Sequence, residues 1–328
     1  MKVKDMTQIP VIDLQAAFSG APGALDAAAD ELQFACENIG FLYIKGHGVD
    51  EGIVDSTFAA AKVFHDQPLE QKLKILVNEN MQGYMPIHGS TTRSSKLAGA
   101  SKPNENEAFF LQREIPPTHP KFGSPQRTAN VWPDGLPGFK EAVLTYYKAM
   151  DGLIARLLPL YARALDMPVD FFANAFQESM STLRLTHYPK MEYAEGSFGV
   201  APHTDSSFIT LLAQNKIAGL QLMSQGGEWI NAPAIDGTFV VNTGDMLNRW
   251  SNGRFLSTPH RAYNLSNTER YAIPYFCHPD PDFAMKCIPS CTSEQNPPKF
   301  PTQTSLEYIE WHKSRNYHHV NKELKEVA

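Results

Sequence analysis

This chain of 328 residues has little of what marks several large classes of protein. Its four cysteines are too few for a disulfide scaffold in a chain of this length, so we expect reduced structural thiols. The net charge of −6 gives no general attraction to a phosphate backbone, and nucleic acid is not expected as a partner. No segment has the apolar run of a signal peptide or a membrane span. These absences favour a cytoplasmic protein that contacts neither nucleic acid nor membrane.

The composition is that of a globular enzyme, with 42% apolar and 20% charged residues and no biased tract. Apolar residues recur at helical spacing in residues 25–38, and a second helix is expected over 51–65. Between them, residues 41–44 have the aromatic and branched content of a strand. A long helical pattern follows Pro137, and Pro159 inside it is expected to kink or split the helix.

After Thr182 the sequence changes to short runs of strand-forming residues separated by turn signals such as Gly226-Gly227 and Asn252-Gly253. Short strands at this spacing predict an antiparallel double-sheet jelly roll rather than alternating strands and helices. The expected strands cover residues 183–188, 208–214, 219–223, 228–232, 238–242, 255–264 and 270–277. A last helical stretch, about residues 305–321, is expected to pack back on the barrel.

The most informative short motif places His203 two residues before Asp205. Alternation along a strand puts residues i and i+2 on one face, so both side chains are expected to point at the same ion. His260, from a distant strand, completes a set of two imidazoles and one carboxylate that leaves open positions on a non-haem Fe(II) ion. Ten residues later, Arg270 offers a planar guanidinium fork to a carboxylate. A lone His-x-Asp is a weak signal, but the three ligands with this arginine predict a metal centre.

Further motifs surround these residues. They are IPVIDL at 9–14, GFLYIKGHGV at 40–49, GY at 83–84, NEAFF at 106–110, LRLTHYP at 183–189, NTGDML at 242–247, RFLSTPHR at 254–261 and ERYAIPYF at 269–276. With them, the chain resembles the Fe(II)/2-oxoglutarate-dependent dioxygenases of the isopenicillin N synthase-like superfamily over nearly its whole length. Several motifs are individually common, but their order is hard to explain otherwise.

The resemblance implies a mainly β fold with flanking helices. Its double-stranded β-helix (jelly roll) core would occupy residues 178–283. An N-terminal region of helices and strands at 8–118 would wrap this core, and a C-terminal extension with a helix would occupy 284–328.

The resemblance also implies a role for each motif residue. His203, Asp205 and His260 would bind Fe(II), and Arg270 would anchor the distal carboxylate of 2-oxoglutarate, the co-substrate used with molecular oxygen. Tyr188 stands where the family commonly supplies a phenol to the same co-substrate.

One position departs from the family pattern at this co-substrate site. The family often has Arg-x-Ser, whereas Arg270 is followed two residues later by Ala272. Losing a hydrogen bond from a hydroxyl to a charged carboxylate would cost about 1.5–3 kcal/mol of binding free energy if nothing replaced it. The phenol of Tyr188 is one candidate replacement. Thr186 stands where plant relatives often carry Asn, so that contact is not transferred.

Four residues are candidate substrate contacts, each with a structural alternative. Arg184 shares a strand face with the co-substrate tyrosine; facing inward it would bind a substrate anion, and a structural salt bridge is the favoured alternative. Phe208 and Phe276 either line the pocket or pack in the core. Tyr84 precedes the polar segment 85–106, which is expected to be a mobile loop that covers the active site or forms a surface excursion. The remaining histidines show no ligand spacing.

The sequence therefore predicts an iron enzyme that uses 2-oxoglutarate and oxygen to hydroxylate, desaturate or cyclise a small molecule. Ala272 keeps open an oxidase on the same scaffold that uses no 2-oxoacid. A third interpretation is a non-catalytic barrel that binds a small ligand or senses iron. The intact ligand set argues against it, because a buried cluster of charges is costly to keep without a use. Neither the substrate nor the oligomeric state is indicated.

Overall fold

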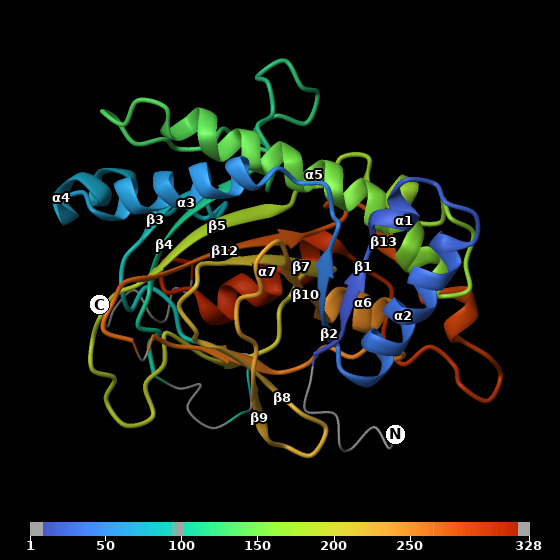
Figure 1. The fold of residues 1–328 in the computed structure, drawn as a ribbon. Coiled ribbons are helices and arrows are strands. Elements are labelled where there is room, and N and C mark those ends of the chain that lie inside the picture. The colour runs from blue at the N-terminus through green and yellow to red at the C-terminus, as the bar shows by residue number, and fades with distance from the viewer. Residues whose placement is uncertain (1–8, 94, 96, 98–101, 265, 321–328) are drawn as a thin grey trace.

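The computed structural model describes residues 9–93, 95, 97, 102–264 and 266–320. Two β-sheets face each other across the middle of this part of the chain, and two long helices lie over the larger sheet (Figure 1). The expected fold class, a double-stranded β-helix with flanking helices, is confirmed.

The larger sheet has eight strands in the order β1-β2-β10-β7-β12-β5-β4-β3, and all its neighbours are antiparallel except β1 and β2. Its strands are β1 (Val11–Asp13), β2 (Phe41–Lys45), β3 (Gly83–Met85), β4 (Glu107–Gln112), β5 (Thr182–Tyr188), β7 (Ile209–Gln214), β10 (Phe239–Thr243) and β12 (Arg270–Cys277). Strands from the N-terminal third thus complete a sheet whose centre comes from the jelly-roll segment.

The smaller sheet has the order β6-β11-β8-β9. Its strands are β6 (Val200–His203), β8 (Leu220–Met223), β9 (Trp229–Asn231) and β11 (His260–Ala262), and a separate pair joins β13 (Ala284–Met285) to β14 (Gln303–Thr304). The helices are α1 (Gln15–Phe18), α2 (Ala24–Asn38), α3 (Glu51–His65), α4 (Leu69–Lys72), α5 (Phe139–Ala164), α6 (Asp245–Trp250) and α7 (Ser305–Asn316).

The main hydrophobic core lies between α3, α5 and the outer face of the larger sheet. Phe64 of α3 packs on Phe109 of β4 and Phe139 of α5, while Tyr147 of α5 packs on Tyr275 of β12. Because side chains alternate along a strand, burying this face turns every second residue of β4, β5 and β12 toward the opposite sheet. That inner face carries the polar residues of the candidate site.

Most elements follow the sequence pattern, with two corrections. Of the kink or split expected at Pro159, the split is wrong, because α5 is continuous over Phe139–Ala164. Residues on both sides of the proline are buried, and this packing offsets the lost hydrogen bond.

The strand expected at 255–264 is reduced to β11, three residues long. The amide of Leu256 donates to the carbonyl of Cys36 at 2.8 Å, and the hydroxyl of Thr258 donates to the carbonyl of Ile39 at 2.6 Å. These groups bond to the segment before β2 rather than to a neighbouring strand, and Pro259 has no N–H to pair.

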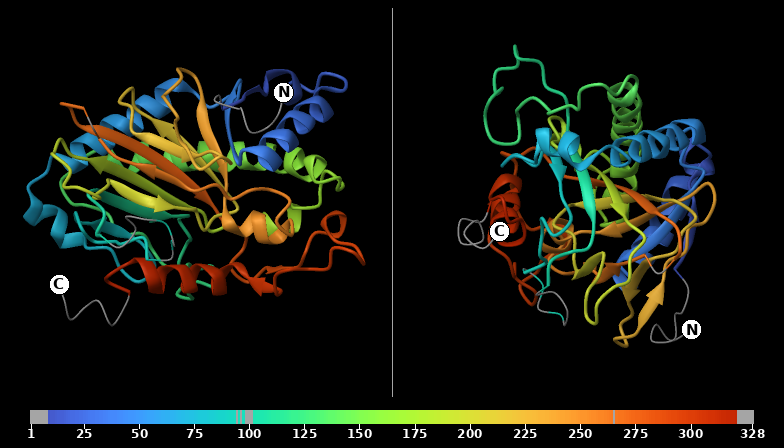
Figure 2. Two further views of the ribbon diagram at one scale, coloured as in Figure 1. Left: turned by 90° about the horizontal axis from the view of Figure 1, so that it is seen from below. Right: turned by 90° about the vertical axis from the view of Figure 1, so that its left-hand side faces the viewer.

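The C-terminal helix packs on the barrel as expected. α7 ends at Asn316, and it lies along one side of the two sheets (Figure 2). The described part of the segment 85–106 lies beside it, since Thr91 donates its amide to the carbonyl of Asn316 at 2.9 Å. All four cysteines are free, as predicted. Among the described residues, no helix is both long and apolar enough to cross a membrane.

Candidate active site

Three predicted metal ligands converge between the two sheets. Nε2 of His203 lies 3.5 Å from Oδ1 of Asp205, and Nε2 of His260 lies 3.6 Å from the same oxygen. One ligand atom from each residue falls within 4.8 Å of the other two. The antiparallel pairing of β6 with β11 brings the two histidines together, because it sets His203 directly opposite His260.

Asp205 reaches this site by a different route from the one expected. β6 ends at His203, so strand alternation does not place the carboxylate, and that part of the prediction is wrong. The backbone turns after His203, where the carbonyl of Asp205 accepts from the amide of Asp245 at 2.7 Å. Oδ2 of Asp205 accepts from Thr210 at 2.6 Å and from Asn242 at 2.8 Å. These bonds leave Oδ1 directed at the histidines.

The hydrogen bonds of the two imidazoles favour the orientation that metal ligation requires. Nδ1 of His203 lies 2.8 Å from the carbonyl of Ala201, and Nδ1 of His260 lies 3.2 Å from the carbonyl of Thr258. A carbonyl can only accept, so Nδ1 carries the proton and each Nε2 lone pair faces the centre.

The electrostatics of the cluster agree with a cation site. Burial alone would raise the pKa of Asp205, but His260 and His203 hold it well below its usual value. Burial lowers the pKa of His203, helped by His260 beside it. Three acceptor atoms would repel one another at this spacing unless a proton or a metal lay among them. Two neutral imidazoles and a carboxylate fit Fe(II), and they leave other coordination positions open.

A pocket next to these ligands contains Arg270, and we call it the Arg270 pocket. It is lined by the three ligands together with Arg184, Thr186, Tyr188, Ala272, Phe276 and neighbouring residues. Arg270 is buried, its Nε donates to the carbonyl of Ile217, and its Nη2 donates to Gln214, while Nη1 has no partner. Its guanidinium carbon lies 4.5 Å from the centre of the Tyr188 ring. A buried guanidinium with a free N–H fits one end of a dicarboxylate.

The register of the sheet shows what faces Ala272. β12 pairs with β5 so that Ala272 lies opposite Thr186, next to the pair formed by Arg270 and Tyr188. The hydroxyl of Thr186 is buried without a hydrogen-bond partner, and both residues line the Arg270 pocket. A hydroxyl is therefore present within the pocket even though position 272 lacks one.

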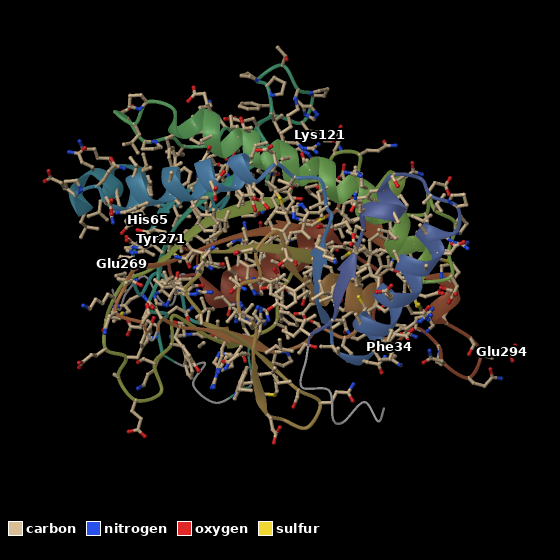
Figure 3. The ribbon with its side chains drawn as sticks, viewed as in Figure 1. Phe34, His65, Lys121, Glu269, Tyr271 and Glu294 are labelled. Atoms are coloured by element: carbon tan, nitrogen blue, oxygen red, sulfur yellow. The ribbon has the colours of Figure 1, made fainter. Side chains whose placement is uncertain are left out.

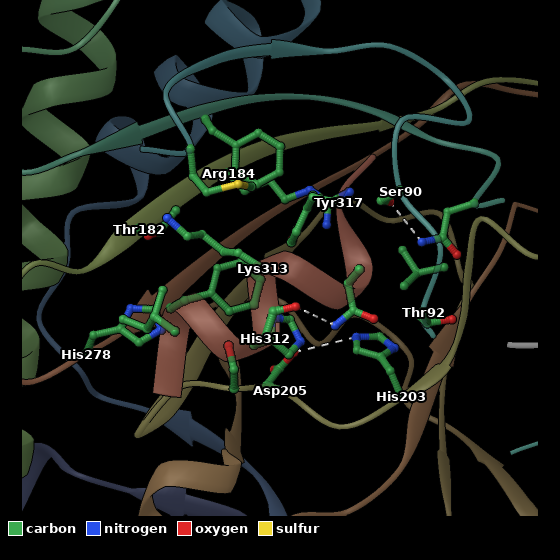
Figure 4. Close-up of a pocket in the computed structure, with 18 of the residues that line it drawn as sticks. Ser90, Thr92, Thr182, Arg184, His203, Asp205, His278, His312, Lys313 and Tyr317 are labelled. Atoms are coloured by element: carbon green, nitrogen blue, oxygen red, sulfur yellow. Dashed lines mark hydrogen bonds and ion pairs between the residues drawn. The ribbon is translucent and has the colours of Figure 1, made fainter. Parts of the chain in front are cut away.

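A second cavity, which we call the Arg184 cavity, adjoins the same ligands (Figure 4). Its wall includes His203 and Asp205, the described threonines of the segment 85–106, Arg184, and residues of α7. Arg184 donates to Asn106, lies over the ring of Phe110 and has an unpartnered Nε. The expected structural salt bridge is absent: no carboxylate pairs with Arg184 in the described part of the chain.

The chain matches two family models. The 2OG-Fe(II) oxygenase superfamily matches residues 179–279, and the model described as non-haem dioxygenase in morphine synthesis N-terminal matches residues 9–135. The sequence is 33% identical to a 2-oxoglutarate-Fe(II) type oxidoreductase from Emericella nidulans, over 98% of this chain and 94% of that one. The chain belongs to the 2OG-Fe(II) oxygenase superfamily.

Further relatives support this membership. Kihadalactone A synthase from Citrus sinensis is 32% identical, with 92% of each chain covered. Among solved structures, a full-length Neurospora crassa protein in complex with alpha-KG (2-oxoglutarate) and thymine matches with a TM-score of 0.80 and 27% identity. That match covers 92% of this chain and 95% of the other. The oxygenase uses Fe(II), 2-oxoglutarate and molecular oxygen, and the alternatives of an oxidase and a non-catalytic barrel are not supported.

Two of the four candidate substrate residues of this oxygenase lie away from both cavities. Phe208 is fully buried among Phe172, Phe176 and Trp250, so it belongs to the core. Tyr84 is equally buried and donates its hydroxyl to a carboxylate on the outer face of the larger sheet. For Phe208 the structure selects the core-packing alternative. For Tyr84 the expected substrate contact is corrected, because its place in β3 directs the ring to the outer face of the sheet. Phe276 and Arg184 line both cavities.

Several residues of the Arg184 cavity were missed by sequence reasoning. They are Gln112, Gln126, Thr182, His278, Ile309, His312, Lys313, Asn316 and Tyr317. The spacing of Ile309, His312, Lys313 and Asn316 is that of one helix face, and this was the available signal. It did not indicate that the face covers a cavity.

A second cluster with metal-ligand spacing lies on the outer face of the sheet. His65, Glu107 and His187 place one ligand atom each within 4.8 Å of one another, although their sequence spacing gave no such signal. His65 lies close to Tyr271 and Glu269 in Figure 3. The ammonium of Lys72 is 2.8 Å from Glu107, so a cation already neutralises this carboxylate. The cluster is an internal ion network of the oxygenase rather than a metal site.

Proposed function

We propose that His203, Asp205 and His260 hold Fe(II), and that Arg270 and Tyr188 anchor the distal carboxylate of 2-oxoglutarate. The converging ligand atoms and the buried arginine with an unpartnered Nη1 support these assignments. When bound, the metal and co-substrate supply the oxidation: one oxygen atom enters the substrate, and the other enters the succinate formed as carbon dioxide leaves.

We further propose that the reaction is hydroxylation of a small anionic molecule held by Arg184. The observation that carries this proposal is the buried guanidinium of Arg184, which has a free Nε and no paired carboxylate in the described part of the chain. A buried cation without a counter-charge is costly, and a substrate carboxylate would neutralise it. Lys313, the other cation of the cavity wall, already pairs with Glu310 at 2.7 Å.

The position of the cavity agrees with a small polar substrate that reacts at the metal. Its wall includes both His203 and Arg184, so a ligand bound to the arginine lies beside the metal ligands. The Neurospora crassa relative was solved with thymine, a small polar ring. We therefore expect polar heterocycles with an acidic group to be better substrates than apolar molecules.

The test is succinate release from 2-oxoglutarate in the presence of paired acidic and neutral small molecules. We expect acidic compounds to stimulate release and Arg184→Met to remove that preference, while Arg184→Lys keeps part of it because the charge remains. Arg163→Met, at an exposed arginine that pairs with Asp26, is the matched control and should behave as wild type. Equal stimulation by acidic and neutral compounds would reject the anion, whereas no succinate under any condition would reject the enzymatic assignment itself.

A further inference from the structure

Two glutamines form an amide pair in the wall of the Arg184 cavity. Gln112, the last residue of β4, donates its side-chain amide to the side-chain oxygen of Gln126 at 2.7 Å. Oε1 of Gln112 and Nε2 of Gln126 then have no hydrogen-bond partner, although both residues are almost fully buried. Buried polar atoms are normally hydrogen-bonded. Both residues line the Arg184 cavity, so a ligand bound there is a candidate partner for the two free atoms.

The edge has a defined chemistry that does not depend on how the amides are oriented. In the observed arrangement Gln112 offers an acceptor and Gln126 offers a donor. If both amides were turned over, Gln126 would donate to Gln112, and the edge would still offer one donor and one acceptor. In either orientation the pair has one unpartnered donor and one unpartnered acceptor, on two residues that line the cavity.

Surrounding contacts hold both glutamines in place. The backbone amide and carbonyl of Gln112 are both bonded to the side chain of Asn130, at 2.9 and 2.8 Å. Gln126 has a positive φ of 66°, a conformation that non-glycine residues seldom adopt. The next residue, Arg127, is buried and pairs with Asp280 at 3.0 Å, which fixes this turn. Such rigid support is typical of a binding contact rather than of a loosely packed surface.

We propose that this amide pair recognises a substrate that carries an N–H next to a carbonyl within a ring, as in a lactam or a pyrimidinedione. Such a cis-amide edge offers one donor and one acceptor side by side, and it satisfies both free atoms of the glutamines together. An isolated carboxylate satisfies only the donor, and an apolar ring satisfies neither. The same cavity wall contains His203 and Asp205, so a ring held at this edge extends toward the metal ligands.

This inference rests on the proposed function, since it assigns the substrate class of the same site. The roles of Arg184 and of the glutamine pair can nevertheless be tested separately. Arg184 binds the acidic group of the substrate, whereas the glutamines bind its ring amide. Water is the competing occupant of the edge, and it would give the glutamines no selectivity among ligands.

Four probes separate these contributions: uracil, 1,3-dimethyluracil, orotate and 1,3-dimethylorotate. Methylation removes the ring N–H groups, while the carboxylate distinguishes orotate from uracil. Binding to the Fe(II)- and 2-oxoglutarate-loaded protein is measured by calorimetry without oxygen. We expect each N–H form to bind about tenfold or more tightly than its methylated partner, because the methylated ring leaves a buried group unpaired.

Substitutions of the two glutamines provide a second test. Gln112→Met and Gln126→Met should reduce the difference between N–H and methylated probes to within about threefold while keeping the preference for orotate over uracil. Gln177→Met, at an exposed amide, is the matched control and should leave both preferences unchanged. Melting temperatures of all variants confirm folding, and the wild-type comparison stands even if one variant fails to fold.

Equal binding of methylated and N–H probes to the wild-type protein would overturn the proposal, as would an unchanged N–H preference in folded glutamine variants. Failure of all four probes to bind at millimolar concentration would also reject this substrate class. If the wild-type protein preferred N–H probes over methylated probes but bound orotate no more tightly than uracil, the role of Arg184 would be rejected. The role of the amide pair would still be supported.

Discussion

At the proposed co-substrate site, position 272 lacks the serine hydroxyl that the family resemblance leads us to expect. Position 272 is alanine, but the strand register sets it opposite Thr186, whose buried hydroxyl has no partner. The two positions are neighbours across adjacent strands, so a hydroxyl on either one reaches the same region of the pocket. We expect Thr186, rather than Tyr188 alone, to compensate for the missing serine.

This expectation gives the first prediction. Thr186→Val should weaken 2-oxoglutarate binding by about tenfold, because a hydrogen bond to a charged carboxylate contributes about 1.5–3 kcal/mol. Adding Ala272→Ser to Thr186→Val should restore most of the affinity. Arg270→Lys alone should lower the affinity for 2-oxoglutarate more than Thr186→Val does. Calorimetric titration of 2-oxoglutarate into the metal-loaded protein measures all three. Wild-type affinity in Thr186→Val would show that this hydroxyl does not contact the co-substrate.

The second prediction concerns the metal ligands. His203→Ala, Asp205→Ala and His260→Ala should each abolish succinate formation, while each protein remains folded because the ligands sit in a preformed barrel. Asp205→Glu should also be severely impaired, since the longer side chain moves the carboxylate by more than the roughly 0.5 Å that such sites tolerate. Activity, metal content and circular dichroism are measured together. Full activity in any of the three alanine variants contradicts the assignment.

At the scale of elements, an ion network links α3, α4, β4 and β5. Glu107 of β4 lies 2.7 Å from His187 of β5 and 2.8 Å from Lys72, with both partners largely buried. Glu107 and His187 are also paired in the strand register. Although burial alone would raise it, the pKa of Glu107 is held far below its usual value by His187, His65 and Lys72. The carboxylate is thus charged at neutral pH.

The third prediction follows from this network. Glu107→Gln should destabilise the protein by about 3–5 kcal/mol, because it leaves the buried Lys72 ammonium without its counter-charge. Asp236→Asn, which breaks the exposed pair with Lys216, is the control and should cost less than about 1 kcal/mol. Denaturant unfolding followed by circular dichroism compares the two. Similar losses in both variants would mean that the network contributes no more than a surface pair.

The fourth prediction concerns α7, which covers the Arg184 cavity. Thr304 and Glu307 form a capping box at its first turn, with bonds of 3.2 and 2.7 Å. Thr304→Ala should lower stability by about 1 kcal/mol. It should also raise the KM for the primary substrate, while 2-oxoglutarate affinity stays unchanged because α7 does not line the Arg270 pocket. An equal effect on both ligands would show that the helix does more than shape the substrate cavity.

For the whole molecule, a buried histidine predicts acid sensitivity. Burial, together with the nearby His312, lowers the pKa of His278 to about 4 from an ordinary value of 6.5. Between these values the unfolded chain takes up a proton that the folded chain does not, so stability falls as pH drops from about 6.5 to about 4. From pH 7 to pH 5 the loss from this residue alone is about 2 kcal/mol.

Measuring the free energy of unfolding of metal-free protein at both pH values tests the fifth prediction. His278→Asn should reduce the acid-induced loss, since asparagine does not titrate. If the variant lost as much stability as the wild type, His278 would not be the source of the effect.

The sequence alone predicted the class of chemistry, an oxidation that depends on Fe(II) and 2-oxoglutarate, but not which oxidation takes place. His203, Asp205, His260 and Arg270 are residue types with few alternative uses in this order, and hydrophobic periodicity predicted most helices and strands. Residue type and local spacing are properties of the chain itself, so a sequence displays them directly.

The proposed substrate contacts depend on the tertiary structure, although Arg184 was already a candidate from the sequence. Gln112, Gln126 and Arg184 come from separate segments, and they share a cavity because β4 pairs with β5 and a fixed turn brings Gln126 to the end of β4. The register also set Thr186 opposite Ala272. Strand register and burial depend on contacts between distant segments, and a shift of one residue would exchange the two faces of a strand. No local pattern in the sequence contains that information.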